Sequence, residues 1–325
     1  MAACLLACDA TGNARTGDPR HSRSSGCRAS VPDPGPGEVE VAIAVGGICG
    51  SDLHYYHDGG VGDFKLREPM ILGHEVVGRI ARLGSGVTGL QEGMRVGIHP
   101  ARYCGACGYC VSGRANICAD VRFLGSAGRF PHVKGGFSNH LVVSAEQIVP
   151  IPDHLSFEQA VFAEPLAVGL HAIRRADDVR GRSVLITGAG PIGAMVILAA
   201  VHAGAARIIV TDIVDEPLVV ARQLGAADAI NVLRSVDPLS DVDFAIEASG
   251  SGAGVSTCLN ALQRGGRVVL VGMPSGAPPT PLFQGGEPRD RRRGLVPVHH
   301  RVRRGGRRAG HRSRHNTAPL GQLCP

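Results

Sequence analysis

The chain has 325 residues, of which 44% are hydrophobic, with 46 glycines and no tryptophan. This indicates a globular protein of about two domains, and no apolar run reaches the ~18–20 residues of a membrane-spanning helix. The net charge of +6 is concentrated, because residues 289–314 carry eleven arginines and one acid. The rest of the chain therefore has a balance of 6 − 10 = −4, which argues against a basic nucleic-acid-binding surface outside this window.

The N-terminal half is rich in strand patterns. Residues 1–31 show no hydrophobic period, and we expect this atypical segment to be disordered. From residue 32 a Pro/Gly turn leads into the alternating run EVEVAIAV, which is typical of a half-buried strand. Short strands and glycine-rich turns continue to about residue 150. The sequence therefore predicts an all-β domain over residues 32–160.

The pattern changes at SFEQAVFAEPLAVGLHAI, where apolar residues recur at helical spacing. Strands and helices then alternate up to RGGRVVLVGM. This alternation predicts an α/β domain with a doubly wound parallel sheet over residues 161–282.

A glycine motif lies at the first strand-to-helix turn of the α/β domain. Gly188, Gly190 and Gly193 form G-x-G-x-x-G together with Pro191 and Ile192. Such a turn brings the backbone and a helix N-terminus close to a pyrophosphate. Asp212, at the end of the next strand, can bind the ribose hydroxyls and repel a 2′-phosphate, which favours NAD over NADP. A glycine turn without a nucleotide, and a plain strand-end role for Asp212, are the alternatives.

Four cysteines lie in one glycine-rich segment with the spacing C-x2-C-x2-C-x7-C. Four thiolates complete a tetrahedron and leave no open position, as in a structural zinc site. An iron–sulfur cluster is the main alternative. Thiolates that bind a metal also favour a reducing compartment, so we expect a cytoplasmic protein. The predicted ligands are Cys104, Cys107, Cys110 and Cys118.

A second set of potential metal ligands is scattered along the chain. Cys49 lies in GGICGSDLHYYHDGG, His74 and Glu75 lie in GHEVVG, and Glu164 lies in AEPLAVGL. A thiolate, an imidazole and a carboxylate, with water in the remaining position, would form a catalytic zinc site. Sequence spacing does not show whether these residues meet, and a structural role for each is the alternative.

Five motifs in one order resemble the zinc-dependent medium-chain dehydrogenases, specifically the polyol branch of sorbitol and L-idonate 5-dehydrogenases. These motifs are GGICGSDLHYYHDGG, GHEVVG, the four-cysteine segment, AEPLAVGLHA and GAGPIG. The resemblance covers roughly residues 32–282. It implies a GroES-like domain followed by a Rossmann domain, one catalytic and one structural zinc ion, and a homodimer or homotetramer.

The resemblance also implies roles for individual residues. It places Cys49, His74 and Glu75 at the catalytic zinc, and puts Glu164 where classical alcohol dehydrogenases have a cysteine ligand. Which of the two glutamates binds zinc directly stays open, and Glu164 is also expected to act near the substrate. The remaining implied roles are a proton relay by Ser51 and His54, substrate contact by Tyr55, and cofactor binding by the glycine motif and Gly272. Surface-loop positions are the alternative for His54 and Tyr55.

The arginine- and glycine-rich tail, residues 283–325, does not fit this pattern. One extra base near the codon for Phe283 would explain it, because residues 284–309 read one frame over permit KVVNREIDVVGSFRFTTEFDEAVDVL. This string reads as a strand and an amphipathic helix, and its GSFRF resembles a family segment that supplies a substrate-binding arginine. We therefore interpret the tail as a frameshift product that removes the last Rossmann strand and damages the subunit interface, and we expect the chain as written to have little or no dehydrogenase activity. A basic nucleic-acid arm is the alternative.

The sequence as a whole predicts a zinc- and NAD-dependent oxidoreductase that acts on a small polyol or sugar acid, with L-idonate first. Sorbitol or L-threonine dehydrogenase activity is the alternative within this class. A catalytically dead NAD-binding fragment is the alternative outside it. Membrane binding is not expected, nor is nucleic-acid binding.

Overall fold

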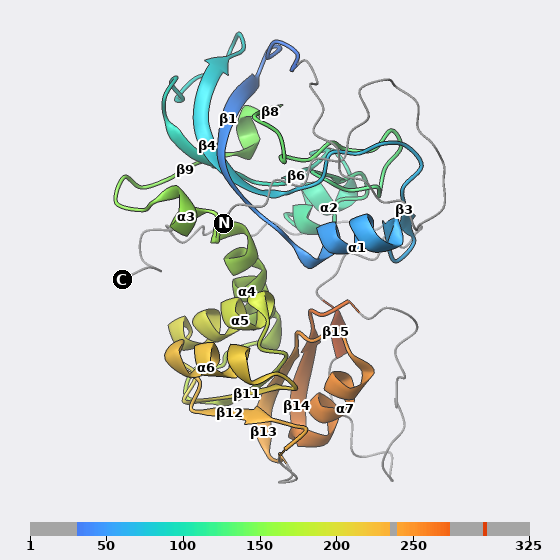
Figure 1. Cartoon of the computed structure of the whole chain (residues 1–325), viewed down its shortest axis with the longest axis vertical. Helices are drawn as coiled ribbons and strands as arrows, with labels where there is room; N and C mark the ends of the chain where they lie inside the picture. The colour runs from blue at the N-terminus through green and yellow to red at the C-terminus, as the bar shows by residue number, and fades with distance from the viewer. Residues whose placement is uncertain (1–30, 235–238, 274–294, 298–325) are drawn as a thin grey trace. The chain divides into compact units, whose positions relative to one another are not determined.

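A computed structural model describes residues 31–234, 239–273 and 295–297. These form two compact units that meet in sequence between Glu164 and Pro165, and each is described by itself (Figure 1). We call residues 31–164 the β domain and the described residues from 165 onward the α/β domain. The 1–31 segment lies outside the described residues except for its last position, as does the tail except for residues 295–297.

The β domain is built on one antiparallel sheet with the strand order β8-β1-β4-β5-β9 (Figure 1). Alternate residues of its strands, such as Val39, Val41 and Val96, are fully buried in a shared core. The strands are β1 (Glu38–Gly47), β4 (Glu75–Leu83), β5 (Arg95–Ile98), β8 (His140–Ser144) and β9 (Ile148–Pro150).

One residue of β1 departs from the alternation expected of a half-buried strand. Glu40 stands between Val39 and Val41, yet it is only 5% exposed. Its carboxylate pairs with the guanidinium of Arg82 on β4 and lies 2.8 Å from Nδ1 of His140 on β8. A buried carboxylate needs such partners, so the neighbouring strands allow a charge on a face that the sequence pattern alone would not reveal.

The expectation of an all-β domain was wrong in one important place, because GSDLHYYHD forms helix α1 (Gly50–Asp58). The Asp52 carboxylate accepts the backbone N–H of Cys49 and caps the helix start. The helix ends at Gly59, which adopts the left-handed conformation (φ 63°). The other short elements are β2 (Gly60–Val61), β3 (Phe64–Lys65), β6 (Ala101–Arg102), α2 (Gly108–Val111), η2 (Ala115–Ile117), β7 (Arg122–Phe123), η3 (Ala145–Gln147) and α3 (Phe157–Ala160).

The α/β domain has a parallel sheet with the order β12-β11-β10-β13-β14-β15. Consecutive residues of β10 face opposite sides: Val184 and Ile186 lie in the core that includes residues of α4, α5 and α6, and Leu185 lies in the core shared with α7. Both faces of the sheet are thus covered, as in a doubly wound fold. The elements are α4 (Ala163–Ala176), β10 (Ser183–Thr187), α5 (Pro191–His202), β11 (Arg207–Asp212), α6 (Asp215–Gln223), β12 (Asp228–Asn231), β13 (Val242–Glu247), α7 (Gly252–Ala261), β14 (Leu262–Leu270) and β15 (Leu295–Pro297).

The sixth strand corrects a second expectation. The tail was expected to remove it, but Leu295–Pro297 forms β15 and pairs in parallel with residues 268–270 of β14. This short strand lies between arginine-rich stretches, and its β-branched residue Val296 favours a strand. Pairing gives hydrogen-bond partners to one edge of β14 over three residues only. Within the described residues, no helix is long and apolar enough to cross a bilayer.

Candidate active site

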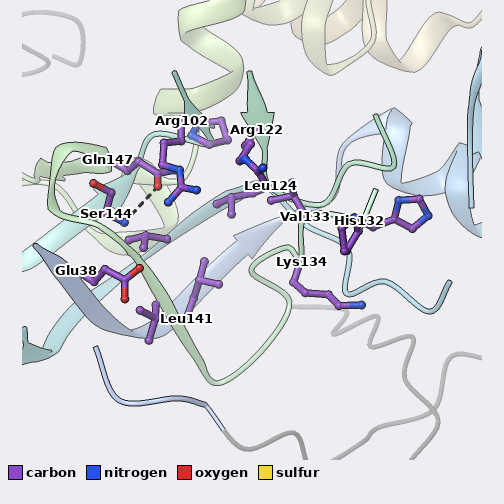
Figure 2. A pocket seen from close by; sticks show the side chains of 14 residues that line it. Glu38, Arg102, Arg122, Leu124, His132, Val133, Lys134, Leu141, Ser144 and Gln147 are labelled. Carbon is purple, nitrogen blue, oxygen red and sulfur yellow. Dashed lines mark hydrogen bonds between the residues drawn. The ribbon is translucent and has the colours of Figure 1, made fainter. Parts of the chain in front are cut away.

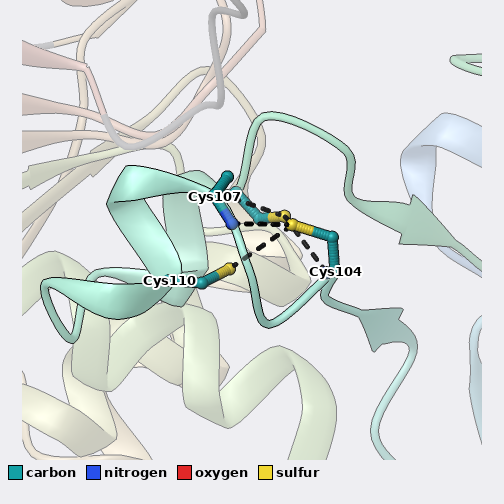
Figure 3. Close-up of side chains that lie close together, drawn as sticks. Cys104, Cys107 and Cys110 are labelled. Carbon is teal, nitrogen blue, oxygen red and sulfur yellow. Dashed lines mark hydrogen bonds between the residues drawn. The ribbon is translucent and has the colours of Figure 1, made fainter. Parts of the chain in front are cut away.

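The four cysteines of the C-x2-C-x2-C-x7-C segment converge between β6 and β7 (Figure 3 labels three of them). Their sulfurs are separated by 3.4 Å (Cys104 to Cys118), 3.9 Å (Cys107 to Cys118) and 4.0 Å (Cys104 to Cys110). A Zn–S bond of ~2.3 Å in a tetrahedron gives an S···S separation of about 3.8 Å. The cysteines are free thiols in the structure, and their spacing suits one tetrahedral ion better than a cluster of several iron atoms. We call this set the closed centre.

The backbone around the closed centre favours thiolates. The N–H of Cys107 points to the sulfur of Cys104, and those of Cys104 and Asp120 point to the sulfur of Cys118, each at 3.3 Å. Hydrogen bonds from the backbone N–H groups of Ala119 and Cys110 lower the pKa of the Cys107 thiol to about 6. Hydrogen bonds to the anion favour it over the thiol. Burial and the neighbouring sulfurs instead raise the pKa of Cys110 to about 12, so the fourth thiolate forms only when a cation binds.

A second cluster brings together Cys49, His74 and Glu75, whose ligand atoms all lie within 4.8 Å of one another. The pairing of β1 with β4 explains how, because it sets Gly47 opposite Glu75. Cys49 follows two residues after Gly47 and thereby reaches a histidine 25 positions away in sequence. A Cβ at Gly47 would come within 2.2 Å of the Glu75 carboxylate, so a larger residue there would displace that carboxylate from the cluster. We call this set the open centre.

The open centre is supported by Asp52, a residue that the sequence analysis did not single out. Asp52 is 2% exposed, and its two oxygens accept the N–H of Cys49 at 2.9 Å and of Gly73 at 3.0 Å. One of them also lies 3.9 Å from Nδ1 of His74. A single carboxylate thus ties together the two loops that carry the ligands. The sequence could have indicated this role, because Asp52 stands three residues after Cys49, the N-cap residue of α1, where an acidic side chain typically bonds back to the cap.

The electrostatics of the open centre call for a cation. Burial raises the pKa of the Cys49 thiol to about 11, and burial also raises the pKa of Glu75. A buried set of acids stays protonated unless positive charge replaces the protons. Cys, His and Glu are all zinc ligands, and three protein ligands leave a position for water or substrate. The donor set therefore fits a catalytic zinc ion.

Glu164 lies beside the open centre but outside the cluster of ligand atoms. It is in the first turn of α4, and its side chain is half-buried. Burial raises the pKa of Glu164 to about 7; the charge of His74 lowers it, and the carboxylates of Glu75 and Asp52 raise it further. The geometry thus places Glu75 within the cluster and Glu164 next to it.

Helix α1 carries the other residues expected near the metal. Ser51 hydrogen-bonds the sulfur of Cys49. His54 stands one turn further on with its side chain 42% exposed, and its Nδ1 lies 2.9 Å from the Asp58 carboxylate. Tyr55 does not lie on a surface loop: it is 4% exposed in an apolar cluster, and its hydroxyl accepts the N–H of Ala127. This position offers no support for its expected contact with substrate.

The glycine motif forms the turn between β10 and α5. Gly188 has φ 90°, and a Cβ there would lie 2.7 Å from the backbone N of Ser249. A Cβ at Gly193 would lie 1.9 Å from the Gly188 carbonyl oxygen. Gly190 is different, because its φ of −64° is ordinary and a Cβ would meet nothing within 4 Å. Nothing among the described residues requires this glycine, whereas a pyrophosphate against the backbone would.

Two other predicted cofactor residues have partners inside the protein. Asp212 ends β11 and accepts the N–H of Ala189, in the glycine turn, at 2.7 Å, as well as those of Ile213 and Val214. A Cβ at Gly272 would lie 2.2 Å from the backbone N of Gly250. Packing alone therefore explains Gly272. Pro191 and Ile192 open α5, with Pro191 exposed as its first residue.

Comparison with protein families matches both domains. Residues 35–153 match the alcohol dehydrogenase GroES-like domain, and residues 191–291 match the zinc-binding dehydrogenase domain.

Individual proteins agree with these family matches. L-idonate 5-dehydrogenase (NAD(P)(+)) of Escherichia coli strain K12 is 41% identical over 244 residues, which cover 72% of this chain and 69% of that protein. Sorbitol dehydrogenase of Bacillus subtilis strain 168 is 40% identical over 254 residues, covering 75% and 70%. The crystal structure of L-idonate 5-dehydrogenase from Escherichia coli K-12 superimposes with a TM-score of 0.72 at 40% identity, covering 75% of this chain and 72% of that one.

Proposed function

This chain belongs to the zinc-dependent medium-chain polyol dehydrogenases, and we propose that within this family it oxidises a secondary alcohol of a sugar acid or polyol, L-idonate first, with NAD. The names of the relatives at 40–41% identity support the substrate class. The relatives also include an L-threonine 3-dehydrogenase at 36% identity. Sorbitol and L-threonine are therefore the alternative substrates.

The observation that carries the proposal is the convergence of Cys49, His74 and Glu75 on one point of the β domain. Zinc bound there supplies Lewis acidity, which brings the pKa of a bound hydroxyl towards neutrality. The protein's own part is to hold two anionic ligands and one neutral imidazole in place through Asp52, and to exclude bulk water by burial. We assign direct metal contact to Glu75, and an outer position, acting through water and near the substrate, to Glu164.

Helix α1 provides the proton path of the proposed reaction. Ser51, at the metal-bound thiolate, accepts the hydroxyl proton of the substrate. His54 lies three residues further along the same helix face and releases the proton to solvent. The Asp58 carboxylate, 2.9 Å from Nδ1 of His54, orients the imidazole. His54→Ala should slow turnover more at low pH than at high pH, where hydroxide can take over.

The α/β domain provides the nucleotide site. NAD bound there would supply the hydride acceptor for the carbinol carbon of the substrate. The backbone at Gly190, where a Cβ would meet open space, receives the pyrophosphate at the N-terminus of α5, and Asp212 binds the ribose hydroxyls. Asp212→Ser should narrow the preference for NAD over NADP, and equal use of both cofactors by the unaltered protein would contradict the role of Asp212.

The activity test compares L-idonate, sorbitol and L-threonine at equal concentration, with NADH formation as the readout. We expect the highest kcat/KM with L-idonate. A clear preference for L-threonine would overturn the substrate class. The same samples need elemental analysis, because iron instead of zinc in a well-folded protein would overturn the metal assignment.

A nucleotide-binding protein without dehydrogenase activity is the second candidate. Two observations favour it. The tail that follows the motifs carries eleven arginines in residues 289–314, and the last strand of the sheet, β15, spans only three residues. We interpret this tail as the product of one extra base. The test replaces residues 284–309 by KVVNREIDVVGSFRFTTEFDEAVDVL, with a family-like start and finish. Equal activity and cooperative melting of the unaltered chain would contradict the frameshift.

A further inference from the structure

The β domain contains a cavity of about 330 Å³ that the proposed reaction does not use (Figure 2). Its apolar wall comes from Leu124, Val133, Leu141 and Val143. Its rim is charged, and Arg102, Arg122 and Lys134 all line it against the single acid Glu38. A small cavity with an apolar wall and a few convergent charged groups is the usual form of a ligand site.

The two arginines face each other. Arg102 of β6 and Arg122 of β7 are register partners in an antiparallel ribbon, and Figure 2 shows their side chains at one end of the cavity. Like charges at opposed positions of two strands destabilise the pair. Among the described residues, neither guanidinium has a carboxylate within ion-pair distance, although arginines elsewhere do, such as Arg129 with Asp120 and Arg207 with Asp228.

The other polar groups of the cavity have partners. The His132 ring contacts the Arg129 carbonyl at 2.7 Å and the Arg67 N–H at 2.9 Å. The Gln147 amide holds the His99 carbonyl and the Ser144 N–H, and Lys134 donates to the Pro69 carbonyl. Glu38 accepts the N–H of Gly35. Among the cationic side chains of the cavity, the two guanidinium groups are therefore the ones for which no protein partner is found within the described residues, whereas the Lys134 ammonium already donates to the Pro69 carbonyl.

We propose that this cavity binds the phosphate group of a small molecule, at a site separate from the open centre. Two guanidinium groups side by side match the oxygens of a phosphate dianion, and each can donate two parallel hydrogen bonds. A carboxylate carries a single charge and fills one such fork. The apolar wall leaves room for a short carbon chain, so a phosphate monoester and inorganic phosphate are the two sources of this chemistry.

The site adjoins both metal centres through the chain. Successive residues of a strand point to opposite faces, so Arg122 faces the cavity while the ring of the next residue, Phe123, lies 5.2 Å from that of His74. Arg102 precedes Cys104 by two residues, and Arg122 follows Cys118 by four. A phosphate held by both arginines would therefore link β6 and β7, the two strands that flank the four-cysteine segment. Occupancy should slow the loss of zinc from the closed centre.

The experiment measures thermal melting of the full zinc-loaded chain with saturating NADH, which fills the nucleotide site. Inorganic phosphate and sorbitol 6-phosphate are compared with sodium gluconate and sodium chloride at equal ionic strength. We expect both phosphates to raise Tm above the chloride value, with gluconate giving a smaller rise. A larger rise with sorbitol 6-phosphate would identify a monoester as the ligand, and equal rises would identify phosphate itself.

The variants Arg102→Gln and Arg122→Gln should each weaken phosphate binding about tenfold, the effect of losing one charged donor pair. Arg264→Gln, at an exposed arginine of the α/β domain, is the matched control and should bind as the unaltered chain does. The double variant Arg102→Lys, Arg122→Lys keeps both positive charges but loses the paired N–H donors of the guanidinium groups, and it should bind phosphate weakly. A phosphate-dependent rise in Tm that persists in the glutamine variants, or no rise above chloride in the unaltered chain, would overturn the proposal.

Zinc release gives a second readout that does not depend on dehydrogenase activity. A colorimetric chelator added to the unaltered chain should remove the closed-centre zinc several-fold more slowly in phosphate than in chloride. The Arg122→Gln variant should show no such difference. Equal release rates in phosphate and chloride for the unaltered chain would contradict the link between the cavity and the four-cysteine segment.

Discussion

The closed and open centres use the same chemistry in different settings. The closed centre takes four identical ligands from 15 consecutive residues of one loop. Cys104 is exposed, Cys107 and Cys110 are half-buried, and Cys118 is buried. The open centre takes three different ligands from the start of α1 and the start of β4. Its donors are buried enough to raise the pKa of Cys49 and Glu75. The comparison shows that one centre is organised by a loop and the other by the whole β domain.

The difference extends to what surrounds each centre. Backbone N–H groups support the sulfurs of the closed centre, so it offers a substrate neither an open position nor an acid or base. The open centre has a buried carboxylate behind it, Asp52, and Ser51 and Glu164 beside it. Stability should therefore depend mainly on the closed centre, and activity on the open one.

Substitution at the open centre should have the largest effect on activity. Cys49→Ser removes a ligand of the proposed catalytic zinc and should lower kcat/KM about a thousandfold, since the Lewis acid contributes several kcal/mol. The melting temperature should stay close to that of the unaltered chain. Steady-state kinetics and calorimetry on the same preparation provide the check, and retention of a tenth or more of the activity would contradict the assignment.

Substitution at the closed centre should affect stability first. Cys107→Ser leaves three thiolates around the ion and should lower the free energy of unfolding by roughly 2–5 kcal/mol, as expected when a structural metal site is lost. The zinc content should fall by half, and the protein that stays folded should keep most of its kcat. Urea unfolding and elemental analysis test this, and an unchanged unfolding midpoint would show that the loop does not need its metal.

Asp52 gives a finer separation of the two centres. Asp52→Asn keeps the size of the side chain but weakens its hold on the N–H groups of Cys49 and Gly73. The zinc affinity of the open centre should fall about 10–100-fold, as is typical for a group behind the ligands. Asp120→Asn, close to Cys118 of the closed centre, is the matched control and should leave the zinc affinity of the open centre unchanged. Competition with a chelator measures both affinities, and equal effects of the two variants would refute a selective role for Asp52.

Acid should empty the open centre before the closed one. The pKa values of single thiols do not separate the two centres, because the pKa is raised to about 11 at Cys49 and to about 12 at Cys110. The closed centre offers zinc four protein ligands and the open centre three, so protons should displace zinc from the open centre first when the pH falls. Zinc content measured after dialysis at stepwise lower pH should fall first in step with the loss of activity, and later in step with the loss of stability. The reverse order would contradict the comparison.

The metal-free protein should show the opposite trend in its own stability. The pKa of Glu164 rises from 4.5 in the unfolded chain to about 7 in the fold. Such a group stabilises the fold fully below pH 4.5, and this contribution is lost as the pH rises to about 7. Chelated protein should therefore unfold at a lower urea concentration at pH 7 than at pH 5, and Glu164→Gln should reduce that difference. Equal midpoints at the two pH values would show that Glu164 is not buried as described.

Patterns confined to a few neighbouring residues were readable from the sequence. The alternation of strands and helices predicted the parallel sheet, and the five motifs placed the chain in its family, as the domain matches and relatives confirm. Local spacing is sufficient for these features because backbone geometry couples residues within a turn or a strand. The proposed zinc ligands of the closed centre are of the same kind, because 15 residues contain the whole set.

Features that depend on contacts between distant residues needed the fold. The meeting of Cys49 with His74 and Glu75 follows from the pairing of β1 with β4, and no local spacing encodes a strand register. Burial of Glu40 is possible because Arg82 and His140 arrive from neighbouring strands. The core position of Tyr55 and the bridging role of Asp52 were likewise settled by side chains from other segments. Sequence specifies which groups are available, but burial and long-range pairing decide their charge, their partners and the chemistry they can perform.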